Sequence, residues 1–75
     1  MIMKSKKQYD YEIGKAIQKA RRRKKMNQEA LADLIGVDRT TISKYESGSN
    51  PIDMSAFLQI CEVLGVSWAD ILGDL

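Results

Sequence analysis

The segment from Arg39 to Ser47, RTTISKYES, combines hydroxyl-bearing and cationic side chains in a pattern that a helix would sort into two sides. At 100° per residue, Ile42 and Tyr45 fall on one side of such a helix. The other side and its flanks carry short polar or cationic side chains: Thr40, Lys44 and Ser47, flanked by Thr41 and Ser43. This outer face has no apolar group to bury. Its hydroxyl and ammonium groups are suited to hydrogen bonds with a polar or anionic partner.

Other kinds of site chemistry have few candidates. The chain contains no histidine, which is the usual general base and a common metal ligand. Its single cysteine, Cys61, lies in an apolar repeat with Phe57, Ile60 and Leu64, a pattern that favours a buried free thiol over a disulfide or a metal ligand. No set of nucleophile, base and oxyanion donor can be assembled from these residues. We therefore expect a protein that is not an enzyme and has no metal, cofactor or small-molecule ligand.

Two short helices joined by a glycine corner would position the polar face. The apolar residues of the first of these helices recur on one side at helical spacing: Leu31, Ala32 and Ile35. Gly36 follows directly and is predicted to end the helix, because glycine adopts the left-handed conformation without a steric penalty. Asp38 is a suitable N-cap for the second helix, and Gly48 is placed to end it.

The spacing of small and apolar residues across this segment is specific. The positions that carry it are Ala32, Gly36, Val37, Ile42 and the run Tyr45-Glu46-Ser47-Gly48. This pattern resembles the helix-turn-helix of the phage lambda-repressor-like (Cro/CI, or Xre) family, and the resemblance extends from about Ile13 to Leu72. It implies an all-α fold, a compact five-helix DNA-binding domain with the helix-turn-helix at helices 2 and 3. In that family the second helix of the motif lies in the DNA major groove.

In that docking geometry the outer face of the second motif helix would read DNA. Arg39 can donate two hydrogen bonds to guanine O6 and N7, Thr40 can offer its hydroxyl or touch a thymine methyl, and Lys44 can reach guanine or a phosphate. Contacts to the phosphate backbone are expected from five polar residues: Asn27, Gln28, Thr41, Ser43 and Ser47. Of these, Asn27 is also a suitable cap for the first motif helix, and Gln28 stands beside the free N–H groups at its start.

The N-terminal part of the chain is expected to hold an arm and a first helix. Residues 1–8 contain three lysines and little to bury, so we expect a basic flexible arm before a DNA-binding domain over residues 9–75. Apolar spacing predicts an amphipathic helix from about Tyr9 to Lys25. Arg21 lies one turn beyond Ile17 on its apolar side, and Glu46 occupies the equivalent edge of the second motif helix. We infer that Arg21 and Glu46 meet as a partly buried ion pair, as the resemblance also implies.

Two further helices are predicted after the motif. Asp53 is a suitable N-cap for a helix from Met54 to Leu64, and Ser67 with Asp70 forms a capping-box-like start for a short last helix. The last helix has more large apolar residues than packing on its own bundle requires: Trp68, Ile71, Leu72 and Leu75. We expect part of this surface to pair with a second copy of the chain; the alternative is that Trp68 belongs to the core.

Charge is distributed unevenly along the 75 residues, although the formal net charge is only +2. Residues 1–25 contain ten Lys or Arg and two Asp or Glu, whereas residues 51–75 contain four Asp or Glu and no Lys or Arg. The N-terminal third is thus suited to an anionic partner. No stretch approaches the roughly 20 apolar residues of a membrane span, and the start of the chain lacks an apolar secretory segment, so we expect a cytoplasmic protein.

Together these features predict a sequence-specific DNA-binding transcriptional regulator. We expect a homodimeric repressor that binds double-stranded DNA at an inverted-repeat operator, of the kind found in phages, restriction-modification controllers or similar mobile elements. The alternative is an antitoxin-type module that binds a partner toxin through residues 68–75 and autoregulates its operon. A membrane-surface role for the first helix is disfavoured, because Ala16 and Ala20 leave it a weak apolar face.

Overall fold

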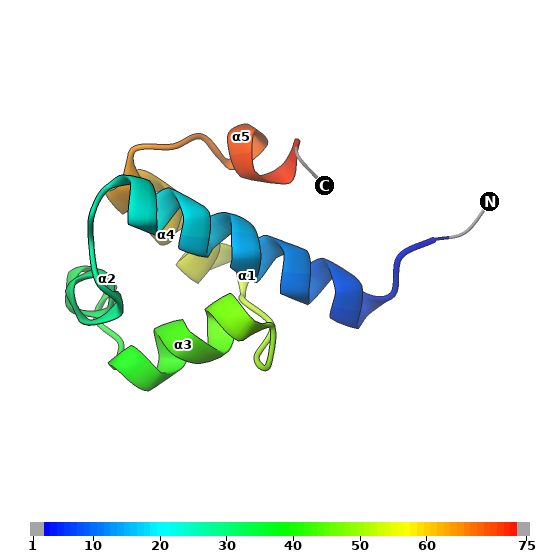
Figure 1. Cartoon of the computed structure of the whole chain (residues 1–75), viewed down its shortest axis with the longest axis horizontal. Coiled ribbons are helices and arrows are strands. Elements are labelled where there is room, and N and C mark those ends of the chain that lie inside the picture. The colour runs from blue at the N-terminus through cyan, green and yellow to red at the C-terminus, as the bar shows by residue number, and fades with distance from the viewer. Residues whose placement is uncertain (1–2, 74–75) are drawn as a thin grey trace.

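Each helix of this protein begins after a polar residue whose side chain accepts a hydrogen bond from the helix backbone. The computed structural model describes residues 3–73, and in this range the chain forms five α-helices and no strand. They are α1 (Lys6–Arg23), α2 (Gln28–Ile35), α3 (Arg39–Ser47), α4 (Met54–Leu64) and α5 (Trp68–Leu72) (Figure 1). Their N-caps, in the same order, are Ser5, Asn27, Asp38, Asp53 and Ser67. The expected all-α, five-helix fold is confirmed.

The limits predicted for the first helix are wrong at both ends. Helix α1 begins at Lys6, so residues 6–8, which were assigned to the arm, are helical. The physical reason is a capping box: the Ser5 hydroxyl accepts from the Gln8 backbone N–H at 3.1 Å, and the Gln8 side chain accepts from the Ser5 N–H at 2.8 Å. The helix ends at Arg23, and Lys25 has a positive φ of 56° that no helix interior permits. Residues 1 and 2 of the predicted arm lie outside the described part of the chain.

The corner between α2 and α3 depends on Gly36. Its φ of 75° places it in the left-handed region, and the N–H of the next residue, Val37, donates to the carbonyl of Ala32 at 3.0 Å. Two residues later the Asp38 carboxylate accepts from the Thr41 N–H at 2.8 Å and starts α3. The chain therefore changes direction within three residues.

Helix α1 crosses α3 at very close range. A methyl group at Gly14 would lie 2.3 Å from the carbonyl oxygen of Tyr45 and 2.7 Å from that of Glu46. Only glycine permits this approach, because any side chain would collide with the backbone of the last turns of α3. The position and tilt of α3 are thus set from within α1.

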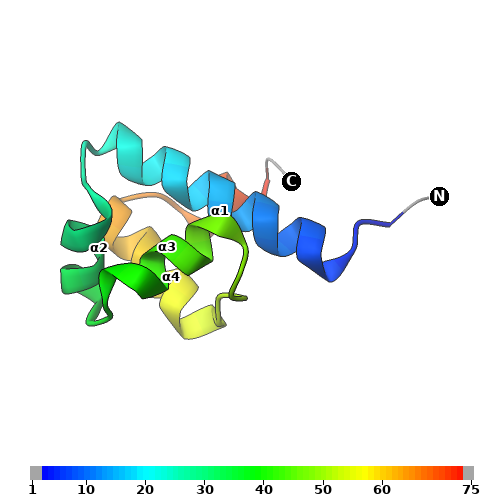
Figure 2. The same ribbon diagram turned by 60° about the horizontal axis from the view of Figure 1, so that its bottom comes forward.

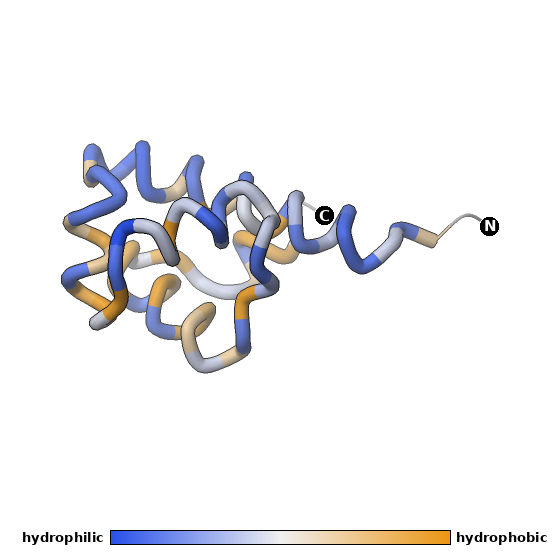
Figure 3. The backbone as a smooth tube through the Cα atoms, turned by 90° about the horizontal axis from the view of Figure 1, so that it is seen from below, coloured by the Kyte–Doolittle hydropathy of each residue, from blue (hydrophilic) through white to orange (hydrophobic). Residues whose placement is uncertain are grey.

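The core lies between α1 and the other helices. Its fully buried large side chains are Ile17, Leu31, Ile42, Ile60 and Leu64. Helix α1 runs across the front of the molecule, with α3 on one side of it and α5 on the other, and α4 lies behind (Figure 1). The turned view in Figure 2 places α3 in front of α4, with α5 behind α1. Seen from below in Figure 3, α1 is coloured mostly as hydrophilic, and the hydrophobic segments gather among the remaining helices.

Candidate nucleic-acid interface

Helix α3 presents its polar side to solvent. Arg39, Thr40 and Lys44 are exposed, whereas Ile42 and Glu46 on the opposite side are buried at 0% and 3% relative exposure. Gly36 and the N-cap Asp38 precede the helix, and Gly48 ends it, so its backbone is held at both ends. The three side chains expected to read bases therefore lie on one accessible surface of a fixed helix.

The flanking hydroxyls of α3 are partly engaged inside the protein. Thr41 is half-buried, and its hydroxyl donates to the Asp38 carboxylate at 2.8 Å. Ser47 is exposed, and its hydroxyl donates to the carbonyl of Lys44 at 3.1 Å and lies 2.8 Å from the Ser49 hydroxyl. Ser43 is half-buried. To donate to a phosphate, the Thr41 and Ser47 hydroxyls would have to turn away from these internal acceptors, because each has one proton to donate.

The start of α3 combines an anionic cap with two nearby cations. The Thr41 backbone N–H, followed by the Thr41 hydroxyl and the positive charges of Lys44 and Arg39, holds the pKa of Asp38 below its ordinary value. Asp38 is exposed, and the smaller opposing effect of burial does not outweigh these hydrogen bonds. Asp38 therefore stays ionised and keeps capping the helix at mildly acidic pH.

The N-terminus of α2 lies beside this surface. Asn27 caps the helix, with its side-chain carbonyl accepting from the Ala30 N–H at 2.8 Å. Asn27 is exposed, and its amide group is positioned at the free N–H groups of the first turn. These donors and the positive end of the helix dipole favour an anion such as a phosphate.

A buried ion pair ties α1 to α3. Arg21 donates from Nε to Glu46 Oε2 at 2.6 Å and from Nη2 to Glu46 Oε1 at 3.0 Å, with both side chains nearly inaccessible. Its remaining Nη1 donates to the carbonyl of Met26 at 2.7 Å, which fixes the connection before α2. This is the pair that was predicted from the sequence.

Gln28 extends this ion pair to the exposed face of α3. Its Nε2 donates to Glu46 Oε1 at 3.0 Å, and its Oε1 accepts from Arg39 Nη1 at 3.3 Å. One continuous chain of polar contacts thus runs from Arg21 in α1 to the guanidinium of Arg39. Sequence reasoning missed this bridge, because it depends on how α2 crosses α3 rather than on any local spacing.

The surface expected for dimer formation is smaller than predicted. Ile71 is 4% exposed and belongs to the core, because α5 packs that side chain toward α1 and α4; its assignment to a dimer surface is wrong. Trp68 and Leu72, one helical turn apart, are exposed at 57% and 36%. Leu75 lies outside the described residues.

Cys61 is a buried free thiol whose pKa is raised by burial.

A family model described as helix-turn-helix matches residues 17–71, which includes the Gly36 corner, α3 and its supporting helices. The chain belongs to the lambda-repressor-like helix-turn-helix family. This family consists of DNA-binding transcription regulators rather than enzymes, and α2 and α3 are its motif helices.

Within residues 3–73, no helix has the length and hydropathy needed to cross a membrane, and no three acidic, cysteine or histidine side chains cluster as metal ligands.

Curated proteins similar to this chain over most of its length include an antitoxin and a transcriptional regulator. Antitoxin PezA from Streptococcus pneumoniae is 32% identical over 62 residues, covering 83% of this chain and 39% of that protein. The uncharacterized HTH-type transcriptional regulator y4aM from Sinorhizobium fredii is 39% identical over 57 residues, covering 76% of this chain and 40% of that protein. This chain thus spans about two-fifths of the length of these curated relatives.

Among solved structures, the clp gene regulator ClgR from Corynebacterium glutamicum has a similar fold. The TM-score is 0.84 at 26% sequence identity, covering 87% of this chain and 69% of that chain. The helix-turn-helix in the two proteins is thus embedded in the same arrangement of surrounding helices.

Proposed function

We propose that this protein is a sequence-specific transcriptional repressor that binds its operator as a homodimer. The observation that carries the proposal is the exposed polar face of α3, where Arg39, Thr40 and Lys44 reach solvent while hydrogen bonds hold the opposite face to α1 and α2. A rigid helix with a solvated, cationic outer side suits insertion into the major groove. Such a regulator would act in the cytoplasm, where the DNA is.

Base recognition rests mainly on Arg39 in this proposal. The contact from Arg39 Nη1 to Gln28 at 3.3 Å is long and exposed, so the guanidinium is oriented yet remains available for guanine O6 and N7. Thr40 and Lys44 reach neighbouring positions of the half-site. The phosphate backbone is held by the start of α2 and by the hydroxyls that flank the reading face: Asn27, Gln28, Thr41, Ser43 and Ser47.

The homodimer is supported by two exposed apolar side chains on one side of α5. Trp68 and Leu72 are spaced one turn apart and would be covered by the same side chains of a second copy around a twofold axis. Trp68 is the only tryptophan of the chain, so its fluorescence reports this contact. A concentration-dependent blue shift in its emission, lost in a Leu72→Asp variant, would support the pairing.

Selection of bound duplexes from a random pool tests the proposed function. The expected result is enrichment of an inverted repeat whose half-site centres lie about 10 bp apart, one turn of the double helix. Retention of DNA without any enriched sequence would contradict operator reading and leave only attraction by charge.

An alanine variant at Arg39 tests whether this residue of α3 reads the operator. Arg39→Ala should weaken binding to the selected operator roughly tenfold or more, since a bidentate contact to guanine is worth about 1–3 kcal/mol. Lys7→Ala, which removes one exposed charge from the first turn of α1, is the matched control. Far-UV circular dichroism should be the same for both variants. Equal affinities for the operator would move base reading away from Arg39.

A second function is favoured by one relative. Antitoxin PezA aligns with most of this chain, so the repressor proposed here could autoregulate an operon whose other product it binds. Co-expression of this protein with the product of the neighbouring gene, followed by purification, distinguishes the two. A stable complex would favour the antitoxin function, and its absence would favour a stand-alone repressor.

A further inference from the structure

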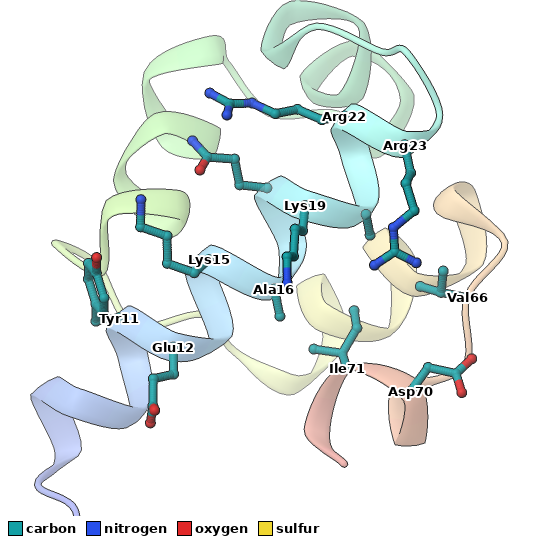
Figure 4. A pocket seen from close by; sticks show the side chains of 12 residues that line it. Tyr11, Glu12, Lys15, Ala16, Lys19, Arg22, Arg23, Val66, Asp70 and Ile71 are labelled. Carbon is teal, nitrogen blue, oxygen red and sulfur yellow. The ribbon is translucent and has the colours of Figure 1, made fainter. Parts of the chain in front are cut away.

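A groove runs along α1 on the side of α5. Its lining comes from α1, from α5 and from the connection before α5, and it encloses about 740 Å³ (Figure 4). The floor is apolar and is formed by Ala16, Ala20, Val66 and Ile71. Of the two α1 alanines at the floor, Ala16 is half-buried and Ala20 is 4% exposed, so only Ala16 offers a small side chain that another backbone could approach.

The rim of this groove carries exposed cations from α1. Lys19 and Arg23 are exposed on α1, and within residues 3–73 no ion pair joins either of them to a carboxylate. Two carboxylates also line the groove: Glu12, which pairs with Lys4 at 2.9 Å, and Asp70, which accepts a hydrogen bond from the Ser67 backbone N–H at 3.3 Å. The groove therefore places positive charge beside a narrow apolar strip, in which Ala16 and Val66 are half-buried while Ala20 and Ile71 belong to the core.

This groove is separate from the DNA-reading face. Helices α3 and α5 lie on opposite sides of α1 in Figure 1. A duplex lying against Arg39 and Lys44 would leave the α5 side of α1 accessible. A DNA backbone would also satisfy only the cations, because it has no apolar group to place on Ala16 and Val66.

We propose that the groove between α1 and α5 binds an acidic amphipathic helix of another protein. The apolar side of that helix would pack on the strip between Ala16 and Val66, and its carboxylates would face Lys19 and Arg23. The groove follows α1 from Tyr11 to Arg23, roughly 18 Å at 1.5 Å per residue, which matches a partner helix of about three turns. Contact with such a helix would couple the DNA-bound protein to a second protein without occupying α3.

The test uses a synthetic helical peptide of about three turns with glutamates on one side and leucines on the other. A peptide of the same composition in scrambled order, which has no apolar side, is the control. With the isotope-labelled full chain, backbone amide shifts are expected at Ala16, Ala20, Val66 and Ile71 and not along α3. The scrambled peptide should bind at least tenfold more weakly, and equal binding of both peptides would overturn the proposal.

Charge-reversal variants separate the groove from general attraction. Lys19→Glu and Arg23→Glu should each weaken peptide binding at least fivefold. Lys7→Glu makes the same change of charge on α1 but lies outside the groove lining, so it should change peptide binding less than twofold. Ala16→Leu should also weaken it at least fivefold by filling the floor. If Lys7→Glu weakened the peptide as much as Lys19→Glu, the groove would not be the binding site.

Two other occupants give distinguishable results. If the free protein were a dimer that Lys19→Glu converts to monomer in sedimentation, the groove would hold a second copy and the proposal would be wrong. If Arg23→Glu weakened operator DNA as strongly as peptide, the site would be a phosphate contact and the proposal would again fail. Arg39→Ala should lose the operator and keep the peptide, so failure of DNA binding cannot be mistaken for failure of the groove.

Discussion

Glu46 of α3 is hydrogen-bonded to both α1 and α2. It is 3% exposed and accepts hydrogen bonds from two nitrogens of Arg21 and from Gln28. Removal of one member of a buried pair leaves the other charge without compensation, which costs about 3–5 kcal/mol. Glu46→Ala should therefore lower the free energy of unfolding by roughly that amount, as measured by urea titration followed by circular dichroism.

A double variant tells whether charge or shape is responsible for that loss. Replacement of both partners, Arg21→Met with Glu46→Leu, removes the uncompensated charge and retains apolar volume. The double variant should be more stable than either single variant, and its operator affinity should still fall because Gln28 loses its anchor. A double variant as unstable as the sum of the singles would contradict an interaction between the two side chains.

Asp38 predicts a specific dependence of stability on pH. Hydrogen bonds from Thr41, the backbone N–H first, lower the pKa of Asp38 in the folded protein relative to the unfolded chain. Its contribution to stability is then fully present above the ordinary pKa of an aspartate, about 4, and is lost as the pH falls through the lowered folded value. Asp38→Asn keeps a cap acceptor without the titration, so its melting temperature should fall less than that of the unmodified protein between pH 4 and pH 2.5. Parallel curves for the two proteins would show that Asp38 does not contribute in this range.

At the scale of elements, the sequence predicted those features that depend on neighbouring residues. The limits of α2, α3 and α4 were predictable because each has its own cap before it and a glycine behind it. The start of α1 was equally local, and it was missed because the Ser5 and Gln8 pair was not recognised as a capping box. The burial of Ile71 was not local, since it follows from how α5 packs on α1 and α4.

Two glycine variants should lose stability for different physical reasons: Gly14→Ala through a collision at the crossing of α1 and α3, and Gly36→Ala through its backbone conformation. Gly14→Ala should stabilise an isolated helix by about 1 kcal/mol, but here the new methyl would meet the Tyr45 carbonyl at 2.3 Å. The helices must then separate, so we expect a net loss of stability of about 1–3 kcal/mol and a loss of operator affinity as α3 shifts. Gly36→Ala meets no atom within 4 Å, and its cost of about 1–2 kcal/mol comes from φ alone. Thermal unfolding together with DNA titration separates the two, because only Gly14→Ala should lose more affinity than its stability explains.

At the scale of the molecule, the sequence predicted which side chains are exposed on α3 but not what holds them. The order of polar residues identifies Arg39 and Lys44, because a helix with one apolar side must expose the other. The bridge through Gln28 and the groove beside α5 arise from contacts between segments that are distant in sequence, with Gln28 and Glu46 separated by 18 positions. Helix packing creates these features, and residue spacing alone does not specify it.

The uneven charge of the molecule leads to a final prediction about salt. Ten of the twelve Lys and Arg residues lie in the first 25 positions, yet α3 itself carries only Arg39 and Lys44. If α3 is the DNA face and Lys44 takes the phosphate rather than the guanine within its reach, Lys44→Gln should reduce the slope of log affinity against log salt concentration by about 1. Lys19→Gln, on the far side of α1, should leave that slope unchanged although it removes the same charge. A reduced slope for Lys19→Gln would instead place the duplex along α1, and the polarised charge rather than the helix-turn-helix would then determine how the protein lies on DNA.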